Sequence, residues 1–363
     1  MSSADYRHMA RALSLAQRGL YSTDPNPRVG CVLVREGEIV GEGWHERAGE
    51  AHAEIHALRQ AGERARGATA YVTLEPCCHH GRTPPCSTAL LDAGVARVVA
   101  AMADPNPRVA GQGLAQLREA GVVVACGLLE AEARALNPGF ILRMTAGRPV
   151  VRLKLAMSLD GRTALASGES QWLTGTAARQ DVQRLRARSS AILTGIGTLL
   201  ADDPGLNVRL PDALRQPLRV ILDSALRTPP TARTLQLPGR VLIFTAVTDS
   251  GLHTPLQAAG AHLVVTPCAA GPGLDLHAVM AELARRECNE IHVECGPTLA
   301  GALLQAHLVD ELVVYMAPIL LGDQARALFR LPELMRMQER RALEIVETRA
   351  VGQDWRLRLR PAP

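Results

Sequence analysis

Apolar positions in the N-terminal part of the chain alternate between the spacings typical of helices and of strands. Apolar residues repeating every three to four positions predict helices, and short runs rich in Val, Ile and Ala predict strands. The expected helices cover residues 4–18, 52–61, 86–93, 111–120 and 129–136. The expected strands cover residues 31–35, 38–43, 70–74, 97–101 and 122–125. This order predicts a mixed sheet with helices on both faces.

A short stretch at residues 139–149 separates this pattern from a second one. It contains Thr145-Ala146-Gly147-Arg148-Pro149, in which Gly and Pro punctuate the chain. Strands are then expected at residues 150–157, 191–194, 218–223, 240–244, 262–265, 290–294 and 312–316, with helical segments between several of them. A chain of 363 residues exceeds the usual size of one domain. We therefore expect two α/β domains, residues 1–146 and 147–363.

Composition places the chain among ordinary globular proteins, because 47% of the residues are hydrophobic and 21% are charged. No apolar run reaches the roughly 18 residues that would span a bilayer, and the first residues carry charges where a signal peptide needs an apolar segment. We expect a cytoplasmic protein with no membrane partner. The net charge is +4, and the basic residues are scattered. This distribution does not suggest nucleic-acid binding but suits anionic small molecules.

The eight cysteines do not suggest a disulfide framework in a cytoplasmic chain of this length. Three of them, Cys77, Cys78 and Cys86, lie close together. His52-Ala53-Glu54 stands at the start of an expected helix, Pro76-Cys77 ends an expected strand, and Cys86 opens another helix. One imidazole and two thiolates are suitable zinc ligands, and they leave a fourth tetrahedral position for water. A thiol at a helix N-terminus also ionises more readily.

Glu54 follows His52 by two positions, so it can lie beside the metal without binding it. A carboxylate there can take a proton from metal-bound water and deliver it to a ring nitrogen and a departing amine. His-x-Glu followed by Pro-Cys is the pattern of zinc-dependent deaminases, although eight residues separate Cys77 from Cys86 here, where the general pattern has two.

Three alternatives remain open for this cluster. His52 and His56 could form a metal pair on one helix face, but the metalloprotease pattern needs Glu where Ala53 stands. The cysteines could be plain core residues. Cys78 could replace Cys77 as the ligand, although the Pro76-Cys77 pair favours Cys77.

Several long motifs resemble the bifunctional riboflavin-biosynthesis deaminase–reductase family. In the N-terminal half these motifs cover residues 25–32, 52–57, 73–86 and 104–107. In the C-terminal half they cover residues 154–162, 167–172, 200–204 and 294–298. The resemblance extends over nearly the whole chain, and the spacing between Cys77 and Cys86 is the form this family uses. Cys78 departs from it, because the family commonly has serine there.

The resemblance implies a cytidine-deaminase-like α/β/α domain followed by a dihydrofolate-reductase-like α/β domain. The first domain would deaminate 2,5-diamino-6-ribosylamino-4(3H)-pyrimidinone 5′-phosphate. The second would reduce the ribosyl group of the product to ribityl with NADPH. By the same resemblance, one Zn²⁺ would be bound by His52, Cys77 and Cys86, with Glu54 as the catalytic proton carrier. The resemblance also implies deaminase substrate contacts from Asn26, His45, Arg82, Asp104 and Asn106. We expect a homo-oligomer.

For the reductase domain the resemblance implies two further sets of residues. NADPH would contact Ala156, Trp172, Thr198, Asp202, Ser224, Gly296, Pro297, Thr298, Leu299, Ala300, Gly301 and Ala302. The substrate would contact Ser170, Arg186, Leu206, Arg209 and Glu294. No G-x-G-x-x-G fingerprint occurs. A glycine turn into a helix can present N–H groups to a phosphate, but it can equally be a simple turn. Arg186 and Arg209 could be solvated arginines, and Trp172 could be a core residue.

Lys154 is the only lysine among 40 basic residues. We predict that it contacts the ribose or its phosphate, because an ammonium is a compact point charge that a guanidinium does not replace. Chance survival of one lysine is the alternative. Two other functions also remain open. One is a nucleic-acid deaminase with a C-terminal binding module, against which the absence of a basic stripe with interleaved aromatics counts. The other is an inactive reductase-like domain that serves as a metabolite sensor or an oligomerisation scaffold.

Overall fold

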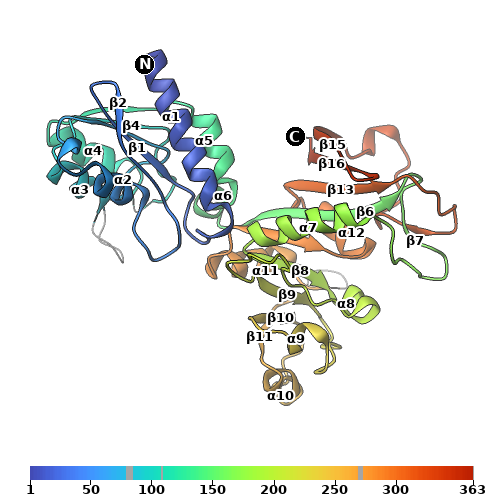
Figure 1. Ribbon diagram of the computed structural model, residues 1–363. Coiled ribbons are helices and arrows are strands. Elements are labelled where there is room, and N and C mark those ends of the chain that lie inside the picture. Colours follow the sequence, from blue (N-terminus) through green and yellow to red (C-terminus); the bar gives the residue numbers. More distant parts are fainter. Residues whose placement is uncertain (79–84, 108, 269–272, 363) are drawn as a thin grey trace. The chain divides into compact units, whose positions relative to one another are not determined.

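The computed structural model describes residues 1–78, 85–107, 109–268 and 273–362. The chain divides into two compact units, Met1–Gly147 and Arg148–Pro363 (Figure 1). In the part of the chain that the structure describes, no helix has both the length and the apolar composition of a membrane span.

Unit 1 contains a five-stranded mixed sheet. In spatial order its strands are β2 (Glu38–Trp44), β1 (Gly30–Arg35), β3 (Thr69–Val72), β4 (Arg97–Ala100) and β5 (Val123–Cys126). β1 runs antiparallel to both β2 and β3, whereas β3, β4 and β5 run parallel to one another. The mixed sheet predicted from the hydrophobic pattern is confirmed.

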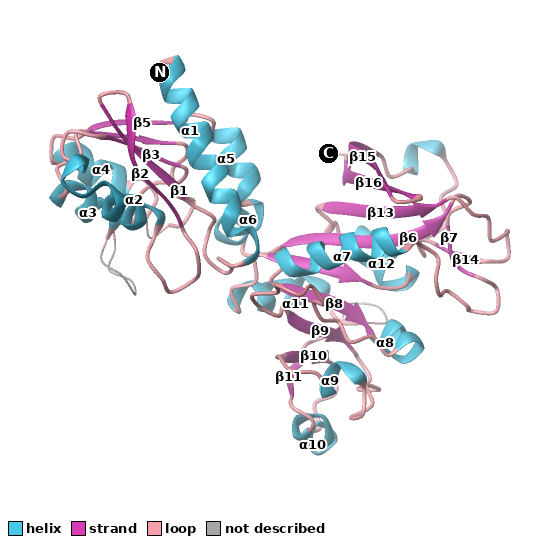
Figure 2. Cartoon of the chain, in the orientation of Figure 1, coloured by secondary structure: helices cyan, strands magenta, loops and turns pink. Residues whose placement is uncertain are grey.

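Helices cover both faces of this sheet, as the pattern also predicted (Figure 2). On one face lie α1 (Ser3–Ala16), α5 (Glu130–Leu136) and α6 (Pro138–Ala146). On the other lie α2 (Ala53–Ala61), α3 (Cys86–Asp92) and α4 (Gln112–Glu119). Because side chains alternate along a strand, Cys31 and Leu33 of β1 pack in the core on the α2 face, and Val32 packs on the α1 face. Two short 3₁₀ helices, η1 (Gln17–Tyr21) and η2 (Gly62–Ala65), follow α1 and α2.

The boundary between the two units lies inside the expected junction at residues 139–149, but most of that stretch is helical and not a short connecting segment. Helix α6 occupies it, beginning with Pro138 and ending where Gly147 adopts a left-handed conformation with φ of +66°. Proline is favoured in the first helical turn and glycine just past the last, so these residues bound a helix here. Phe140 of this helix is buried in the core on the α1 face.

Two glycines of β2 let α2 approach the sheet closely. A Cβ atom at Gly41 would lie 2.2 Å from the carbonyl oxygen of Ala57, and one at Gly43 would lie 2.4 Å from that of Ala53. Any larger residue would push α2 outward. These glycines therefore fix the helix that begins just after His52 and carries Glu54.

Unit 2 contains a nine-stranded sheet. In spatial order its strands are β11 (Ala261–Val265), β10 (Val241–Thr245), β9 (Leu218–Leu222), β8 (Ala191–Gly195), β12 (Glu290–Glu294), β6 (Val150–Ser158), β13 (Glu311–Ala317), β16 (Asp354–Pro361) and β15 (Leu343–Val351). The strands from β11 to β13 are parallel, and β16 and β15 complete the sheet as an antiparallel hairpin. The seven predicted strands of this half are confirmed.

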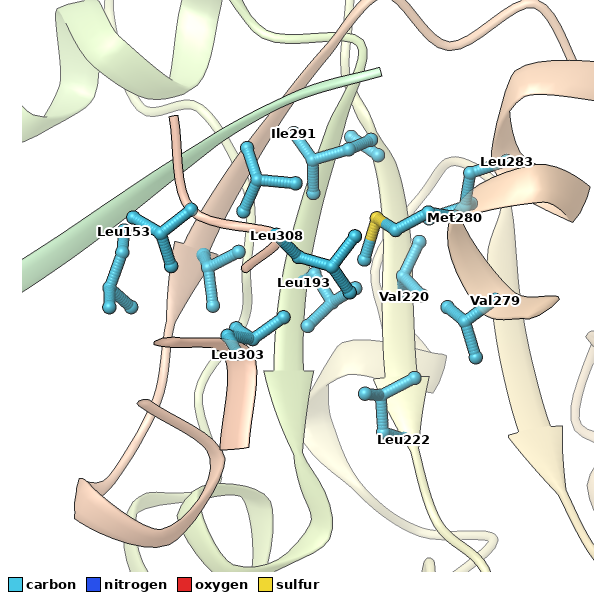
Figure 3. Packing of buried hydrophobic residues seen from close by; sticks show 14 of the residues in the cluster. Leu153, Leu193, Val220, Leu222, Val279, Met280, Leu283, Ile291, Leu303 and Leu308 are labelled. Atoms are coloured by element: carbon cyan, nitrogen blue, oxygen red, sulfur yellow. The ribbon is translucent and has the colours of Figure 1, made fainter. Parts of the chain in front are cut away.

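The sheet of unit 2 is also covered on both faces. The largest core lies between the sheet and two helices, α11 (Leu276–Arg285) and α12 (Pro297–Gln305). Val279, Leu283 and Leu303 of these helices belong to one buried cluster with Leu153 and Leu193 of the strands (Figure 3). The opposite face is covered by α7 (Thr176–Arg188), α8 (Ile196–Asp202), α9 (Arg233–Gln236) and α10 (Ser250–Ala258). Strand residues such as Lys154 and Glu294 alternate with core residues and therefore lie on this second face.

In unit 2 the hydrophobic pattern did not predict the C-terminal hairpin or three smaller elements. The smaller elements are β7 (Arg162–Ala164), which pairs with β14 (Arg326–Ala327), and the 3₁₀ helix η3 (Met337–Glu339). Nearly every residue of β15 is exposed, so this strand lacks the buried face that a hydrophobic pattern reveals. A usable signal existed in β16, where Trp355, Leu357 and Leu359 alternate with arginines after a turn at Gly352.

Candidate metal centre and reductase site

Three side chains of unit 1 converge as the sequence predicted. His52 is the N-cap residue of α2, Cys77 follows β3, and Cys86 is the first residue of α3. The His52 ring and the two sulfur atoms each offer one ligand atom, and these atoms all lie within 4.8 Å of one another. His52 Nδ1 lies 3.2 Å from Cys86 Sγ and 3.6 Å from Cys77 Sγ.

The protonation of this cluster fits a cation-binding site. Hydrogen bonds from the Cys86 thiol and the His52 ring lower the pKa of Cys77 to about 4. The backbone N–H of Cys86 also donates to Cys77 Sγ at 3.4 Å. The hydrogen bond between the Cys86 thiol and Cys77, together with burial, raises the pKa of Cys86. Without an ion, one sulfur is therefore a thiolate and the other keeps its proton. Two sulfurs and one imidazole form a donor set that Zn²⁺ favours.

Glu54 lies in the first turn of α2, two residues beyond His52. The residue is only 3% exposed, and burial raises the pKa of its carboxyl group to about 7, against the opposing effect of His52. A group with that pKa can both accept and release a proton near neutral pH. The structure thus provides a proton carrier beside the convergent ligands.

Two of the predicted deaminase substrate residues lie against this cluster. The His45 ring lies 5.3 Å from the His52 ring, edge to face. Asn26 Nδ2 is 3.0 Å from His45 Nε2, and His45 Nδ1 is 3.1 Å from the carbonyl oxygen of Ala51. Burial lowers the pKa of His45, so its neutral ring donates to Ala51 and accepts from the Asn26 amide. This pair holds the Asn26 side chain in a defined orientation.

Asp104 and Asn106 share a loop between β4 and α4. Asp104 Oδ1 accepts a 2.8 Å hydrogen bond from the backbone N–H of Asn106. Burial, reinforced by the charges of Glu75 and Cys77, raises the pKa of Asp104 to about 6. Arg82, the fifth predicted contact, lies outside the described residues.

In unit 2 a buried ion pair joins helix α7 to the sheet. Arg186 Nε and Nη2 donate to the two carboxylate oxygens of Glu294 at 2.6 and 2.9 Å, and Arg186 Nη1 donates to the carbonyl oxygen of Asn207 at 2.9 Å. Although burial alone would raise it, the Arg186 guanidinium lowers the pKa of Glu294 well below its ordinary value. The alternative of a solvated Arg186 is wrong.

Lys154 lies beside this pair. It is the register partner of Glu294 across the parallel strands β6 and β12, and its Nζ lies 5.9 Å from the centre of the Tyr315 ring. Burial lowers the pKa of Lys154, while the Glu294 carboxylate opposes that shift. His292, which the sequence analysis missed, places Nε2 3.1 Å from Glu294 Oε1. The available signal was its position two residues before Glu294, on the same strand face.

The residues predicted to contact NADPH divide into two groups. Most lie on β6 or at the carboxyl ends of strands β8, β9 and β12, where parallel sheets bind ligands. Among them, Thr198 Oγ1 of α8 lies 3.9 Å from where a Cβ at Gly296 would stand, so α8 and the start of α12 are adjacent. The Leu299 side chain of α12 lies 3.3 Å from where a Cβ atom at Gly195 would stand, so α12 also packs against the end of β8.

Trp172 forms the second group by itself, because it lies in the loop between β7 and α7. It is 70% exposed, and Arg179 lies 4.7 Å from the centre of its ring. The alternative of a core tryptophan is therefore wrong. Ser170 is half-buried in the same loop. Leu206 is fully buried, and Arg209 is exposed but within the electrostatic influence of Arg186 and Glu294.

Comparison with known proteins matches both units. Residues 149–357 match the family model of the RibD C-terminal domain, and residues 2–102 match the cytidine and deoxycytidylate deaminase zinc-binding region. Riboflavin biosynthesis protein RibD of Escherichia coli (strain K12) is 55% identical, covering 96% of this chain and 97% of the relative. The protein of the same name from Haemophilus influenzae is 49% identical, covering 99% and 98%.

Solved structures agree over the full length. Acinetobacter baumannii RibD, form 1, superposes with a TM-score of 0.92 at 46% identity and covers 99% of both chains. A Thermotoga maritima diaminohydroxyphosphoribosylaminopyrimidine deaminase/5-amino-6-(5-phosphoribosylamino)uracil reductase superposes with a TM-score of 0.87 at 32% identity, also over 99% of both. The predicted cytidine-deaminase-like and dihydrofolate-reductase-like folds, the zinc-binding deaminase domain and the NADPH-dependent reductase domain are confirmed. The chain belongs to the RibD family of bifunctional deaminase–reductases of riboflavin biosynthesis.

Proposed function

We propose that unit 1 hydrolytically deaminates 2,5-diamino-6-ribosylamino-4(3H)-pyrimidinone 5′-phosphate and that unit 2 reduces the ribosyl group of the product with NADPH. The observation that carries the first step is the convergence of His52, Cys77 and Cys86 beside the buried carboxyl group of Glu54. The description of the Thermotoga maritima relative names a phosphoribosylamino-pyrimidine as the compound that is deaminated and a phosphoribosylamino-uracil as the compound that is reduced.

His52, Cys77 and Cys86 would hold the zinc ion, which supplies an acidified water molecule. Glu54 would carry one proton from the attacking water to the pyrimidine ring nitrogen, and a second, from the hydroxyl group so formed on the ring carbon, to the departing amine. Water thus adds to the ring carbon and ammonia leaves. A carboxyl pKa of about 7 suits both transfers, because neither protonation state is strongly favoured near neutral pH.

Five residues are proposed to orient the pyrimidine ribotide. Asn26, held by His45, offers an amide, and Asp104 and Asn106 approach from the loop before α4. Arg82 offers a guanidinium that matches a phosphate group. The proposal for Arg82 rests on family resemblance alone.

In unit 2 the geometry separates the roles of two arginines. The guanidinium of Arg186 is engaged with Glu294 and Asn207, so we propose that it orients the Glu294 carboxylate. Arg209 is exposed and is the better candidate for the substrate phosphate. Lys154 would contact the ribose next to Glu294, and Ser170 and Leu206 complete the proposed set.

NADPH would supply the hydride for the ribosyl carbon. We propose that the start of α12 presents the backbone N–H groups of Gly296, Thr298 and Leu299 to its phosphates, because the first turn of a helix leaves those groups without intrahelical partners. Pro297 has no N–H group and that of Ala300 donates to the carbonyl oxygen of Gly296, so Pro297, Ala300, Gly301 and Ala302 are proposed as packing contacts. Ala156, Trp172, Thr198, Asp202 and Ser224 are the other proposed contacts. The exposed Trp172 ring is accessible to a bound nucleotide.

A coupled assay tests the whole proposal. The protein, loaded with one zinc ion per chain, is incubated with the diamino-pyrimidinone ribotide and NADPH. We expect ammonia release followed by loss of NADPH absorbance that requires prior deamination. Deamination without NADPH oxidation would favour the sensor alternative for unit 2. Deamination of an oligonucleotide but not of the ribotide would favour the nucleic-acid alternative.

We also propose a cytoplasmic homo-oligomer. Metal binding by Cys77 and Cys86 needs reduced thiols, which the cytoplasm maintains. The edge strand β15 exposes Leu343 and Ile345, which are 41% and 66% exposed, and such an apolar edge is a natural contact for a second copy. Light scattering on a size-exclusion column tests this, because Ile345→Lys should lower the mass to that of a monomer.

A further inference from the structure

Glu75 is a buried residue whose carboxylate oxygens accept hydrogen bonds from three backbone N–H groups. The residue is 3% exposed and directly precedes Pro76-Cys77. Its Oε2 atom accepts hydrogen bonds from the backbone N–H groups of Asp104 at 3.0 Å and Gly111 at 2.9 Å. Its Oε1 atom accepts one from the N–H of Leu114 at 3.1 Å. A buried carboxylate persists only with such compensation, and hydrogen bonds to a charged acceptor are the stronger kind.

The three donors bracket one segment of the chain. Gly111 is the N-cap of α4, and Leu114 lies in its first turn. Glycine offers no side chain to accept from these N–H groups, so Glu75 takes the place of a capping residue, with its charge at the positive end of the helix. Asp104 begins the loop that carries Asn106. One carboxylate therefore fixes both ends of residues 104–111.

A second contact ties this segment to the metal cluster. A Cβ atom at Gly113 would lie 2.0 Å from the carbonyl oxygen of Pro76, so α4 packs directly against the residue that precedes Cys77. Beyond Cys77, the hydroxyl group of Ser87 lies 3.0 Å from the carbonyl oxygen of Cys77 and 2.7 Å from Gln116 Oε1 of α4. Helix α4 is thus held at several points along the chain segment that carries this ligand.

We propose that Glu75 is a positioning residue of the deaminase: it holds the loop bearing Asp104 and Asn106 in register with Cys77. This inference rests on the proposed function of unit 1. Glu75 itself touches neither the substrate nor the metal and moves no proton. Its effect is on where the substrate-binding loop lies relative to the reacting centre.

The test is Glu75→Gln, which keeps the side-chain length but replaces one acceptor oxygen with an NH₂ group. At least one N–H then loses its acceptor, which frees the loop. We expect the deaminase KM to rise about tenfold or more, while kcat per bound zinc stays within about threefold. Amide hydrogen exchange in residues 104–114 should accelerate by about the same factor as KM, and reduction of the deaminated substrate should be unchanged.

Two further variants separate positioning from general stability. Gly113→Ala forces α4 away from Pro76 and should raise the same KM. Asp5→Asn is the matched control: Asp5 is equally buried in unit 1 and accepts hydrogen bonds from Tyr71 and Arg97 on the α1 face, so its loss should leave KM unchanged.

The proposal fails if Glu75→Gln leaves KM and the exchange of residues 104–114 unchanged, or if kcat falls only in proportion to lost zinc at constant KM. It also fails if Asp5→Asn raises KM as much as Glu75→Gln does. Hydrogen exchange needs no substrate. A wild-type protein that does not deaminate the ribotide would therefore refute the proposed function, while the exchange result would still decide the role of Glu75 in holding the loop.

Discussion

The metal centre of unit 1 and the reductase site of unit 2 treat buried charge in different ways. In unit 1 a thiolate, a thiol and a buried carboxyl group with a raised pKa surround a place for a cation. In unit 2 the Glu294 carboxylate is already neutralised by Arg186, with His292 and Lys154 beside it. The buried negative charge of the first site would be compensated by a zinc ion, whereas that of the second is compensated by the protein's own side chains. Substitution of Glu54 should therefore change chemistry alone, whereas substitution of Glu294 should change both chemistry and stability.

Glu54→Gln should give the largest effect and should act on chemistry alone. The amide cannot carry the proton, so we expect deamination to fall below detection, a loss of about 10²–10⁴-fold. Zinc content should stay near one ion per chain, because the carboxylate is not a proposed ligand. Neither the reductase rate nor the free energy of unfolding should fall. Ammonia release, metal analysis and urea unfolding measure these quantities, and retained deamination would remove Glu54 from the mechanism.

Glu294→Gln should change chemistry and stability together. The substitution leaves the buried Arg186 guanidinium without its counter-charge, which costs on the order of 3 kcal/mol in the free energy of unfolding. We expect reductase activity to fall with it, while the deaminase rate is unaffected.

The matched control for this substitution is Glu282→Gln on α11. Glu282 pairs with two arginines, where Glu294 pairs with one, but the side chains of Arg285 and Arg286 are 70% and 41% exposed. The control should cost less than about 1 kcal/mol. Equal losses for the two variants, measured by urea unfolding, would show that burial of the Arg186 pair is not the cause.

Lys154→Arg should have an intermediate effect confined to the reductase. Lys154 is the register partner of Glu294, and its ammonium group lies 5.9 Å from the centre of the Tyr315 ring. A guanidinium is larger and planar and does not reproduce a compact point charge there. We expect reductase kcat/KM to fall about tenfold, with the deaminase rate of the same chain as the internal control. Unchanged KM and kcat would mean that Lys154 is a lysine by chance.

The contrast between the sites also explains what the sequence could predict. His52 and Cys86 were readable because each stands at a helix start, which Pro85 marks for Cys86. The predicted strand end at Cys77 is wrong, because β3 ends at Val72, five residues earlier. The pairing of Lys154 with Glu294 was not readable, because β12 lies between β8 and β6, whose paired residues are 100 and 140 positions earlier in the chain. No local pattern contains that register. The engagement of Arg186 with Glu294 depends on the same strand order, and only family resemblance indicated the two residues.

Cys78→Ser should give the smallest effect and tests the choice of ligand within the metal centre. The Cys78 sulfur lies 3.9 Å from Gln112 Oε1, which is a weak contact, and its residue is half-buried. Cys78 is also absent from the cluster of convergent ligand atoms. We expect zinc content to be unchanged and deaminase kcat/KM to stay within about twofold.

Cys77→Ser is the matched control for that substitution. Its hydroxyl group is a poor zinc ligand, so the variant should lose both metal and deamination while the reductase stays active. If the outcomes were reversed, with metal lost from Cys78→Ser and kept by Cys77→Ser, the assignment of the two neighbouring thiols would be wrong. The contrast between the units would survive that result, because either thiol would still leave unit 1 dependent on an ion that unit 2 does not need.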